Sequence, residues 1–590
     1  MGKIIARIVE VRGISVKAEL LELLPPYYSI SGRVYQAPKI NSFVKTKVGL
    51  DTIICQIKGE YYNEYYRSKT SSESDALKIK NSDKTAYYLD LNVIGYISNN
   101  NMIQGLRILP IVSANIEMLD DKDYSVIYKT ATNEDIFLGK NLFDSSKDVQ
   151  CNINKLFVSH IGIFGNTGSG KSNTLTAIMQ QYMFKVFSTN TNKSKTIVFD
   201  LNNEYGKNSI IPESFKKIYN LKLKGDGDKI PLEFDFLSED QMCIFLNATE
   251  KMQTPIIKQT YKLFNKIRNG NIDENYFKSL LESVILNSRV PLFKKIRFNL
   301  RNYLQNIDRF ECFHETNIYY VDENGIKFYN GSNEMKNAIG NIRINIPTDA
   351  LDLFMFCLLF IIARENDGGT VYEYISPLIG KYEKLKDEFS KVFDLNASNF
   401  DLFDNDKKMV VIQLGNVNND LKEIIPHLIS SIQFENQMNY KEQYGMNDTI
   451  LQIVIDEAHN LLYEDETDRI HTAGLYIFEK IIKEGRKFAT FLYIASQRPF
   501  DISNTIMSQL HNYFIHKLVN PNDIAKIRKT VAFMDEQSLD FITILGPGEC
   551  IVSGTAITIP QFIKVNQVDK ESRPNSDNII LIGANGIFNN

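Results

Sequence analysis

Hydrophobic and polar positions follow three different patterns along the chain. Up to about residue 130, short β-branched segments partly alternate between apolar and polar positions, and glycines separate them. Many short strands with glycine-containing turns are typical of a small β-barrel or sandwich. The strands expected in this part cover residues 3–11, 52–57, 87–94 and 106–112, with a polar loop at residues 67–76.

From about residue 150, apolar strand-like segments alternate with segments of helical spacing, which indicates a parallel sheet. Between about residues 205 and 405 the pattern is mostly helical and rich in Lys, Asn and Phe. We interpret that segment as an insertion in the sheet domain. The strands expected in the sheet cover residues 160–164, 196–200, 409–414, 451–456, 490–496 and 513–517.

A glycine-rich segment of the form GxxxxGK[ST] follows the first of these strands and precedes helical spacing. Its glycines allow several backbone N–H groups to face one anion, and the helix N-terminus adds its positive end. Lys171 is expected to reach the β- and γ-phosphates of a nucleotide, and the Ser172 hydroxyl to ligate Mg²⁺. A chance glycine-rich turn is the alternative, but the strand–loop–helix context favours nucleotide binding. The expected binding residues are Gly165, Asn166, Thr167, Gly168, Ser169, Gly170, Lys171, Ser172 and Asn173.

Two acidic residues, Asp456 and Glu457, lie at the carboxyl end of the strand expected at residues 451–456. In phosphate-loop enzymes the carboxyl end of such a strand carries the groups for Mg²⁺ and for the attacking water. We therefore expect Asp456 to hold Mg²⁺ and Glu457 to polarise the water. The alternative is a helix N-terminus that favours acidic residues.

Asp200 ends another expected strand, Glu204 lies one turn further on, and Tyr205 comes next. Either acid could reach the γ-phosphate side of the site, so Glu204 is a second candidate for catalysis. An acidic helix cap with Tyr205 as a packing residue explains the same pattern, and the sequence leaves both interpretations open.

Gln497 follows the strand expected at residues 490–496, where it could sense the γ-phosphate or orient water. Arg486 precedes that strand and is a candidate arginine finger, a residue that a neighbouring subunit inserts into the site. The alternative for Arg486 is an ordinary solvated surface arginine.

Length and composition narrow the class of protein. A chain of 590 residues is too long for one core and predicts about two to four domains. The net charge of −4 argues against a protein whose whole surface coats nucleic acid, although a basic channel remains compatible with it. The six cysteines form no CxxC pair, and together with an N-terminus without a signal-peptide pattern they favour a reducing, cytoplasmic location. The apolar residues 353–363 are too few to span a bilayer, so we expect a buried helix and no membrane partner.

Four motifs stand in order along the chain, and with the strand-rich N-terminus they resemble the HerA family of the FtsK–HerA branch of RecA-like motor proteins. These motifs are GNTGSGKS at 165–172, DLNNEY at 200–205, IDEAHN at 455–460, and EGRK at 484–487 with SQRP at 496–499. The resemblance implies an α/β fold: a RecA-like phosphate-loop ATPase core with an N-terminal small β-barrel and a helical insertion. The expected divisions are the barrel at 1–130, the core at 131–250 and 405–565, the insertion at 251–404 and a tail at 566–590.

The same resemblance implies an ATP- and Mg²⁺-dependent DNA translocase or helicase that forms a homo-hexameric ring around double-stranded DNA. Gln497 and Arg486 would act as sensor and finger. One departure concerns Ser159 and His160, because many relatives carry an arginine before this histidine. The trans-acting group therefore falls to Arg486 or to another arginine such as Arg498.

The resemblance also implies a partner effector: a NurA-like nuclease in DNA-end processing, or a Sir2-like NADase or other nuclease in antiviral defence. The chain carries no recognisable nuclease constellation, so such an activity would belong to the partner. The divergent insertion and the missing arginine favour the defence branch. Two other functions stay open: a nucleotide-gated scaffold that activates an effector without processive translocation, and a secretion or conjugation coupling ATPase. The missing transmembrane pattern disfavours the coupling ATPase.

Overall fold

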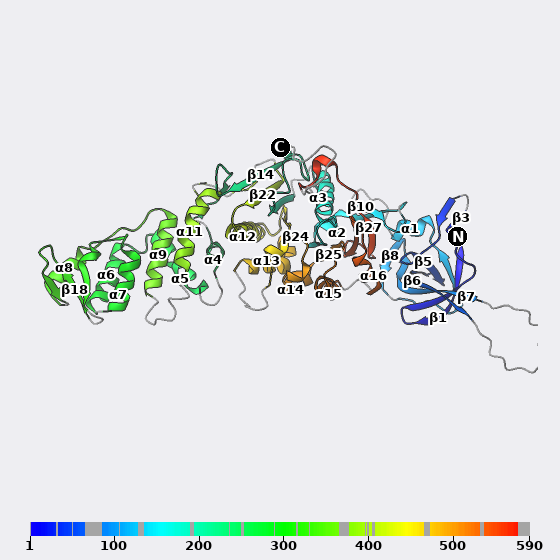
Figure 1. Ribbon diagram of the computed structural model, residues 1–590, viewed down its shortest axis with the longest axis horizontal. Coiled ribbons are helices and arrows are strands. Elements are labelled where there is room, and N and C mark those ends of the chain that lie inside the picture. Colours follow the sequence, from blue (N-terminus) through cyan, green and yellow to red (C-terminus); the bar gives the residue numbers. More distant parts are fainter. Residues whose placement is uncertain are drawn as a thin grey trace, which may run out of the picture.

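The protein is described here from a computed structural model. The structure describes residues 2–575, apart from residues 31–32, 50, 65–84, 106, 128–134, 145, 189–193, 235–236, 249–252, 288, 314–316, 330, 365–376, 396, 398–400, 404–406, 465–472, 532–535 and 558. The molecule is elongated, with a β-barrel at one end, a large mixed sheet in the middle and a mainly helical part at the other end (Figure 1).

Six antiparallel strands close into the N-terminal barrel. Their order is β2-β1-β9-β5-β6-β7, and β7 pairs back onto β2, which closes the sheet and removes its edges. These strands are β1 (Ile4–Arg12), β2 (Ser15–Leu20), β5 (Phe43–Val48), β6 (Asp51–Glu64), β7 (Thr85–Ser98) and β9 (Asn115–Met118). Alternate residues such as Ile53, Cys55 and Ile57 point into the barrel core. The short strands β3 (Tyr27–Ile30), β4 (Arg33–Gln36) and β8 (Asn101–Gln104) and the helix α1 (Asp121–Ile127) are added to the barrel.

The barrel expected from the sequence is confirmed, but one of its strands is wrong. Residues 107–112 have no regular structure, and the strand that completes the barrel is β9, which begins at Asn115. Pro110 explains the difference, because a proline lacks the N–H that a strand inside a sheet needs. The polar loop expected at residues 67–76 lies outside the described residues.

An eleven-stranded mixed sheet forms the middle of the molecule, in the order β11-β10-β27-β26-β25-β12-β24-β23-β13-β22-β14. The strands from β25 to β14 are parallel, and β26, β27, β10 and β11 extend the sheet with antiparallel pairs. All six expected sheet strands are confirmed: β12 (Ile161–Phe164), β13 (Ser194–Asp200), β22 (Met409–Asn416), β23 (Ile450–Ile455), β24 (Thr490–Ser496) and β25 (Asn512–Ile515). The remaining strands are β10 (Asp135–Asn141), β11 (Asp148–Asn152), β14 (Lys216–Lys222), β26 (Glu549–Gly554) and β27 (Gln561–Lys564).

Helices cover both faces of this sheet. Along β24, Phe491, Tyr493 and Ala495 join the core under α3 (Lys171–Ser188), whereas Leu492 and Ile494 face the other layer. The second layer contains α12 (Asn419–Tyr444) and α13 (Ala473–Glu484). Shorter helices at the sheet are α2 (Ile153–Phe157), α14 (Asn504–Gln509), α15 (Pro521–Thr530) and α16 (Glu536–Asp540). Because helices cover both faces of the sheet, its strands are continuous apolar runs in the sequence.

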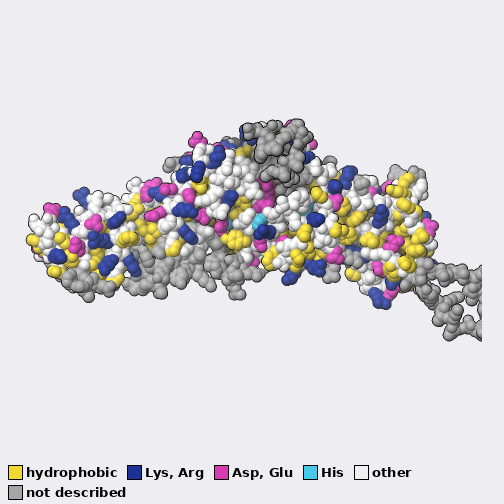
Figure 2. Space-filling view, viewed as in Figure 1, with side chains coloured by type: hydrophobic (Ala, Val, Ile, Leu, Met, Phe, Trp, Pro, Cys, Tyr) yellow, Lys and Arg dark blue, Asp and Glu magenta, His cyan; other side chains and the backbone are white. Residues whose placement is uncertain are grey.

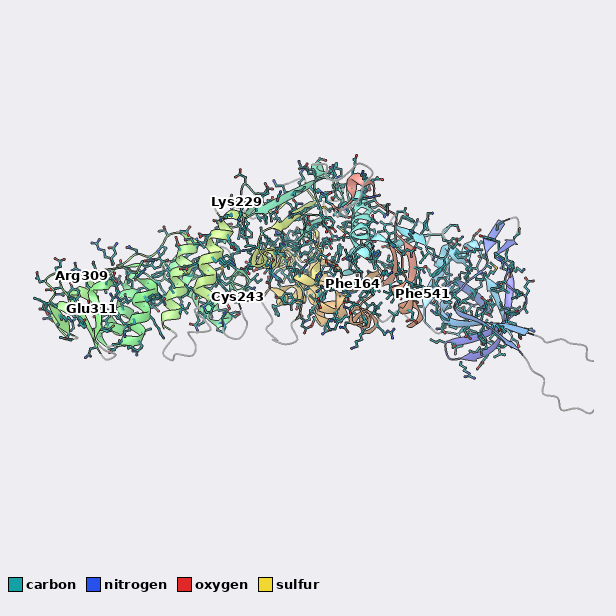
Figure 3. The ribbon with its side chains drawn as sticks, in the orientation of Figure 1. Phe164, Lys229, Cys243, Arg309, Glu311 and Phe541 are labelled. Carbon is teal, nitrogen blue, oxygen red and sulfur yellow. The ribbon has the colours of Figure 1, made fainter. Side chains whose placement is uncertain are left out.

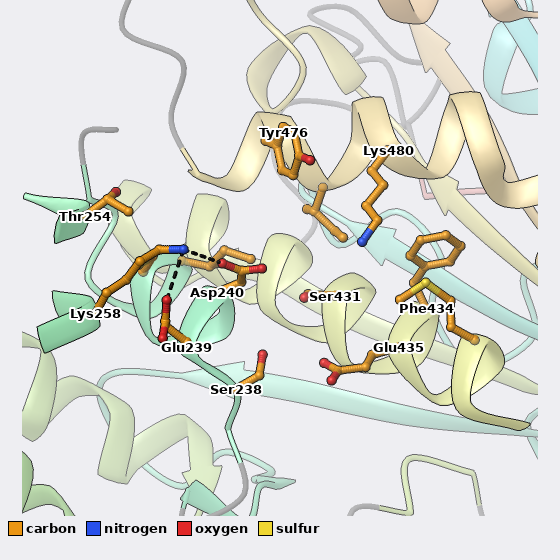
Figure 4. Close-up of a pocket in the computed structure, with 14 residues that line it drawn as sticks. Ser238, Glu239, Asp240, Thr254, Lys258, Ser431, Phe434, Glu435, Tyr476 and Lys480 are labelled. Carbon is orange, nitrogen blue, oxygen red and sulfur yellow. Dashed lines mark hydrogen bonds and ion pairs between the residues drawn. The ribbon is translucent and has the colours of Figure 1, made fainter. Parts of the chain in front are cut away.

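The segment between β14 and β22 is mainly helical but also contains short strands. Figure 3 places Arg309 and Glu311 toward its far end and Phe164 in the core. Its helices are α4 (Glu239–Phe245), α5 (Thr254–Arg268), α6 (Glu274–Leu286), α7 (Val290–Leu300), α8 (Asn333–Gly340), α9 (Ala350–Arg364) and α11 (Pro377–Val392). Its strands are β15 (Ile230–Pro231), β16 (Leu304–Gln305), β17 (Phe310–Phe313), β18 (Asn317–Val321), β19 (Lys327–Tyr329), β20 (Arg343–Ile344) and β21 (Phe393–Asp394).

The most apolar segment of the chain is the buried helix that the sequence predicts. α9 packs against α5 and α7, and Phe354 and Phe356 on it are almost completely buried. Within the described part of the chain, no helix combines the length and the apolar character needed to cross a bilayer. All six cysteines are free thiols.

Candidate functional site

The order of the central strands brings the sequence motifs together. β12, β24, β23 and β13 are neighbours and run parallel, so the segments that follow them meet at one edge of the sheet. Open α/β sheets bind their ligands at this carboxyl edge. The glycine-rich loop, Gln497, the Asp456–Glu457 pair and the Asp200–Tyr205 segment all lie there. Acidic side chains and a histidine are visible together over the middle of the molecule in Figure 2.

The glycine-rich loop connects β12 to α3, as the motif predicts. Gly168 and Gly170 have φ angles of 73° and 107°, which residues with a side chain rarely adopt. A Cβ at Gly170 would also lie 2.9 Å from the Gly548 Cα, so the loop packs closely on the turn before β26. The first N–H groups of α3 have no partner within the helix and provide donors at the end of the loop.

Lys171 begins α3 and is buried, and its Nζ donates to the Asn166 carbonyl at 3.3 Å. Burial lowers the pKa of Lys171, while the carboxyl groups of Glu457, Asp456 and Glu204 act in the opposite direction. Ser172 is the next residue of the helix. The Asn173 side chain bonds the Asn566 carbonyl and the Val568 N–H, both at 3.1 Å, so it anchors the chain that follows β27.

Asp456 lies directly after β23 and is buried. Its Oδ2 accepts a hydrogen bond of 2.8 Å from the Tyr205 hydroxyl, and its Oδ1 accepts one of 2.9 Å from the Glu457 N–H. Burial raises the pKa of Asp456, and these two hydrogen bonds oppose that shift.

Glu457 has a left-handed backbone with φ of 51°, an uncommon conformation for a residue with a side chain. Its Oε2 is buried without a hydrogen-bond partner and lies 3.4 Å from the His459 Nδ1. Burial, followed by the charge of Asp456, raises the pKa of Glu457. Strained backbones of this kind cluster at functional sites.

The Asp200–Tyr205 segment is a turn that carries site residues. No helix begins between residues 201 and 212, so the helix cap offered as the alternative is wrong. Asp200 accepts hydrogen bonds from the N–H groups of Glu204 at 2.9 Å and Tyr205 at 2.8 Å, so it fixes the turn. Burial and the nearby Asp456 raise the pKa of Glu204 to about 7, and its Oε2 is buried without a partner. Tyr205 is fully buried, but packing does not describe it completely, because its hydroxyl reaches Asp456. Sequence reasoning missed this contact.

Gln497 lies at the same edge of the sheet, and its Oε1 accepts a 2.6 Å hydrogen bond from the Thr167 hydroxyl of the glycine-rich loop. A cavity of about 720 Å³ opens beside this pair. Its lining includes Asn166, Arg498 and Asp523. The charge of Arg498 also acts on Glu457, so this arginine belongs to the same edge.

Arg486 lies apart from this cluster. It is exposed in the short segment before β24, whereas Gln497 follows that strand. Because β24 has seven residues, the two ends are separated by roughly 20 Å at about 3.3 Å per residue. Arg486 is close enough to His511 to help lower the pKa of that histidine, and His511 precedes β25 at this amino edge. The fold therefore places Arg486 away from the glycine-rich loop of its own chain.

A parallel sheet whose glycine-rich loop, buried lysine and paired carboxylates converge at its carboxyl edge defines a RecA-like phosphate-loop ATPase. The family profile described as "Helicase HerA, central domain" matches residues 136–432, half of the chain. The chain belongs to this HerA helicase family, and it is an ATP-dependent enzyme of the helicase class.

Several proteins that are similar over most of this chain carry the name of the same family. The chain is 27% identical over 484 residues to the "DNA double-strand break repair helicase HerA" of Sulfurisphaera tokodaii, covering 80% of this chain and 76% of the relative. It is 23% identical over 535 residues to the "Probable DNA double-strand break repair helicase HerA" of Methanocaldococcus jannaschii, covering 86% and 91%. Among solved structures, VirB4 of Thermoanaerobacter pseudethanolicus matches with a TM-score of 0.42 and 14% identity, over 75% of this chain and 99% of that one. The plasmid coupling protein TrwB in complex with ADP and Mg²⁺ matches with a TM-score of 0.38 and 12% identity, over 70% and 86%.

Proposed function

We propose that this protein is an ATP-hydrolysing DNA translocase or helicase that acts as a homo-hexameric ring on double-stranded DNA and works with a partner effector. The observation that carries the proposal is the convergence of the glycine-rich loop, Lys171, Asp456 and Glu457 at one edge of the sheet. The names of the relatives, which are helicases of DNA double-strand break repair, support a DNA substrate.

The donor set fits ATP with Mg²⁺. Mg²⁺ takes oxygen ligands and is held by one or two protein groups together with phosphate oxygens. The Ser172 hydroxyl and the Asp456 carboxylate are the groups assigned to it, and the described residues contain no separate metal cluster of His, Cys, Asp or Glu. When bound, the ion would neutralise charge on the phosphates. Lys171 and the loop N–H groups would hold the phosphates themselves.

Glu457 is assigned as the base that polarises the attacking water. Its Oε2 is buried, accepts no hydrogen bond and lies 3.4 Å from the His459 Nδ1, so it could accept a hydrogen bond from that water. Glu204 is the second candidate, because its Oε2 is also unpaired and its pKa of about 7 lies near working pH. Gln497, held on the loop by Thr167, is assigned as the sensor of the γ-phosphate.

The position of Arg486 supports a ring. At the amino edge of the sheet it can serve as a finger only for the nucleotide of a neighbouring subunit. Head-to-tail contacts of this kind close into rings when the rotation between subunits allows it. Six chains of charge −4 carry 6 × (−4) = −24, so DNA would pass only where basic residues line the channel.

A partner would supply the nuclease or NADase activity, in DNA-end processing or antiviral defence. The second candidate function is a nucleotide-gated scaffold that activates such an effector without processive translocation. The six free thiols agree with a reducing, cytoplasmic location for either function.

The test is ATP hydrolysis by the purified full-length chain, with and without double-stranded DNA, at several salt concentrations. A translocase predicts hydrolysis that rises with DNA, and the stimulation should fade as salt rises, because phosphate contacts release counterions. Lys171→Ala should abolish hydrolysis while native mass measurement still shows a folded assembly. A rate indifferent to DNA would favour the scaffold, and normal hydrolysis by Lys171→Ala would overturn the assigned site.

A further inference from the structure

His516 is a fully buried histidine beside the glycine-rich loop, and none of the roles assigned above uses it. It follows β25, the parallel neighbour of β12. Its backbone N–H donates to the carbonyl of Phe164, the last residue of β12, at 2.7 Å. The side chain therefore begins at the point where the chain leaves the sheet and enters the loop.

His516 lies against the loop at both of its ends. A Cβ built on Gly165 would lie 2.5 Å from the His516 Cβ, and a Cβ built on Gly170 would lie 3.6 Å from the His516 Cε1. The His516 Cβ is thus packed against the first glycine of the motif and its ring against the last. Any change in loop shape has to be accommodated by this side chain, because interiors are close-packed.

The polar atoms of this ring have no satisfactory partners. Burial lowers the pKa of His516 to about 4, and Lys171 acts in the same direction, so the ring is neutral at pH 7. A neutral imidazole has one N–H donor and one acceptor nitrogen. Both His516 nitrogens are buried without a hydrogen bond of normal geometry, and the Ser169 and Glu549 backbones are the polar groups that act on the ring. Buried polar groups are nearly always paired, so two unpaired nitrogens require an explanation.

We propose that His516 is a positioning residue of the phosphate loop: in the loop conformation that holds the nucleotide, its ring N–H donates to the Ser169 carbonyl. The inference rests on the proposed nucleotide site. The Ser169 carbonyl already accepts the Gly548 N–H at 2.9 Å, and a carbonyl oxygen has a second lone pair to offer. The Ser169 backbone already acts on the ring in this structure. A well-aligned hydrogen bond in the nucleotide-bound loop would contribute to nucleotide affinity rather than to the hydrolysis step.

The test compares His516→Phe with His427→Phe. His427 is a matched control, because it is also fully buried, has an unpaired Nε2 and has a pKa lowered to about 4 by burial. It lies on α12 and packs on Phe478, so it does not belong to the loop. We expect mant-ADP to bind roughly tenfold more weakly to His516→Phe, the loss of about one buried hydrogen bond, and within about twofold of wild type to His427→Phe. In ATP hydrolysis the KM should rise while kcat at saturation stays nearly unchanged.

A matched pair of variants separates hydrogen bonding from packing. Gln and Met have similar length and shape, but only Gln offers a donor, so His516→Gln should bind mant-ADP more tightly than His516→Met. If His516→Phe does not fold, the comparison of His516→Gln with His516→Met still tests the hydrogen bond. Suppose that Lys171→Ala loses binding as expected. The inference would then be overturned if His516→Gln and His516→Met bound mant-ADP equally well. Equal affinities of His516→Phe and His427→Phe would overturn it too. Unchanged binding by Lys171→Ala would instead overturn the nucleotide site itself.

Discussion

The Tyr205 hydroxyl donates a 2.8 Å hydrogen bond to Asp456 Oδ2, across 251 positions of the sequence. Tyr205 follows β13 and Asp456 follows β23, which are adjacent strands, so the pairing is a direct result of strand order. A carboxylate that accepts this bond is held in one rotamer, which matters if the same group holds a metal ion.

Removing this hydroxyl should weaken Mg²⁺ binding at the site without unfolding the protein. We expect Tyr205→Phe to raise the Mg²⁺ concentration needed for half-maximal ATP hydrolysis by about tenfold, the lower end of the effect of losing a group that orients a metal ligand. Tyr493→Phe is the matched control, because Tyr493 is equally buried and its hydroxyl bonds the Phe157 carbonyl, away from the carboxyl edge. Similar Mg²⁺ dependence in the two variants would show that the Tyr205 hydroxyl only packs.

The two candidate bases can be separated by amide substitution. Glu457→Gln should bind ATP normally but hydrolyse it at least about 10²-fold more slowly, because water is held without being polarised. Glu204→Gln should reduce the rate much less if Glu457 is the base. Single-turnover hydrolysis with excess enzyme measures the chemical step for both. The opposite ranking of the two variants would transfer the assignment to Glu204.

Glu204 also predicts a pH dependence of stability. Burial and Asp456 raise its pKa to about 7 in the folded protein, above the usual value for glutamate in the unfolded chain. Between those two pKa values the folded state binds more protons than the unfolded state, so the contribution of Glu204 to stability falls as pH rises from about 4.5 to 7. Replacing it by Gln should remove this loss.

Urea unfolding at pH 5 and pH 7.5, without nucleotide, checks this expectation. Glu204→Gln should gain stability relative to wild type at pH 7.5, with a smaller gain at pH 5. Glu442→Gln, at an exposed position on α12, is the control and should parallel wild type at both pH values. An equal difference between Glu204→Gln and wild type at both pH values would contradict the raised pKa.

Strand positions in the core could be predicted because the parallel strands are covered on both faces and therefore read as apolar runs. Once these strands are parallel neighbours, the polar residues at their carboxyl ends must converge, which places Lys171, Asp456 and Gln497 together. The barrel strand at residues 106–112 was predicted wrongly, because apolar character outweighed the missing N–H of Pro110.

The remaining site residues depend on the order of strands, which local pattern does not contain. Nothing next to Tyr205 in the sequence indicates that β13 and β23 are neighbours, so its bond to Asp456 could not be foreseen. His516 is similar, because its relation to the loop follows from the pairing of β25 with β12. A buried histidine at the carboxyl end of a strand next to a glycine-rich loop is the signal that a search could use.

Arg486 should complete the site of a neighbouring subunit. Its place before β24 puts it roughly 20 Å from the loop of its own chain, at about 3.3 Å per residue. Arg486→Ala should therefore lower turnover by about 10³-fold or more while ATP still binds, as expected for a finger. Lys487→Ala, a change at the next exposed cation, should retain activity.

Mixed assemblies provide the decisive measurement. When Arg486→Ala and Lys171→Ala chains are combined in equal amounts, about a quarter of head-to-tail interfaces join an intact Lys171 to an intact Arg486 of the next subunit. Hydrolysis should then exceed that of either variant alone. A parallel mixture of wild type and Lys171→Ala shows whether one inactive site silences a whole ring. If that mixture retains activity but the two variants never complement each other, Arg486 is not the trans-acting group, and Arg498, which lies near Glu457, becomes the arginine to test.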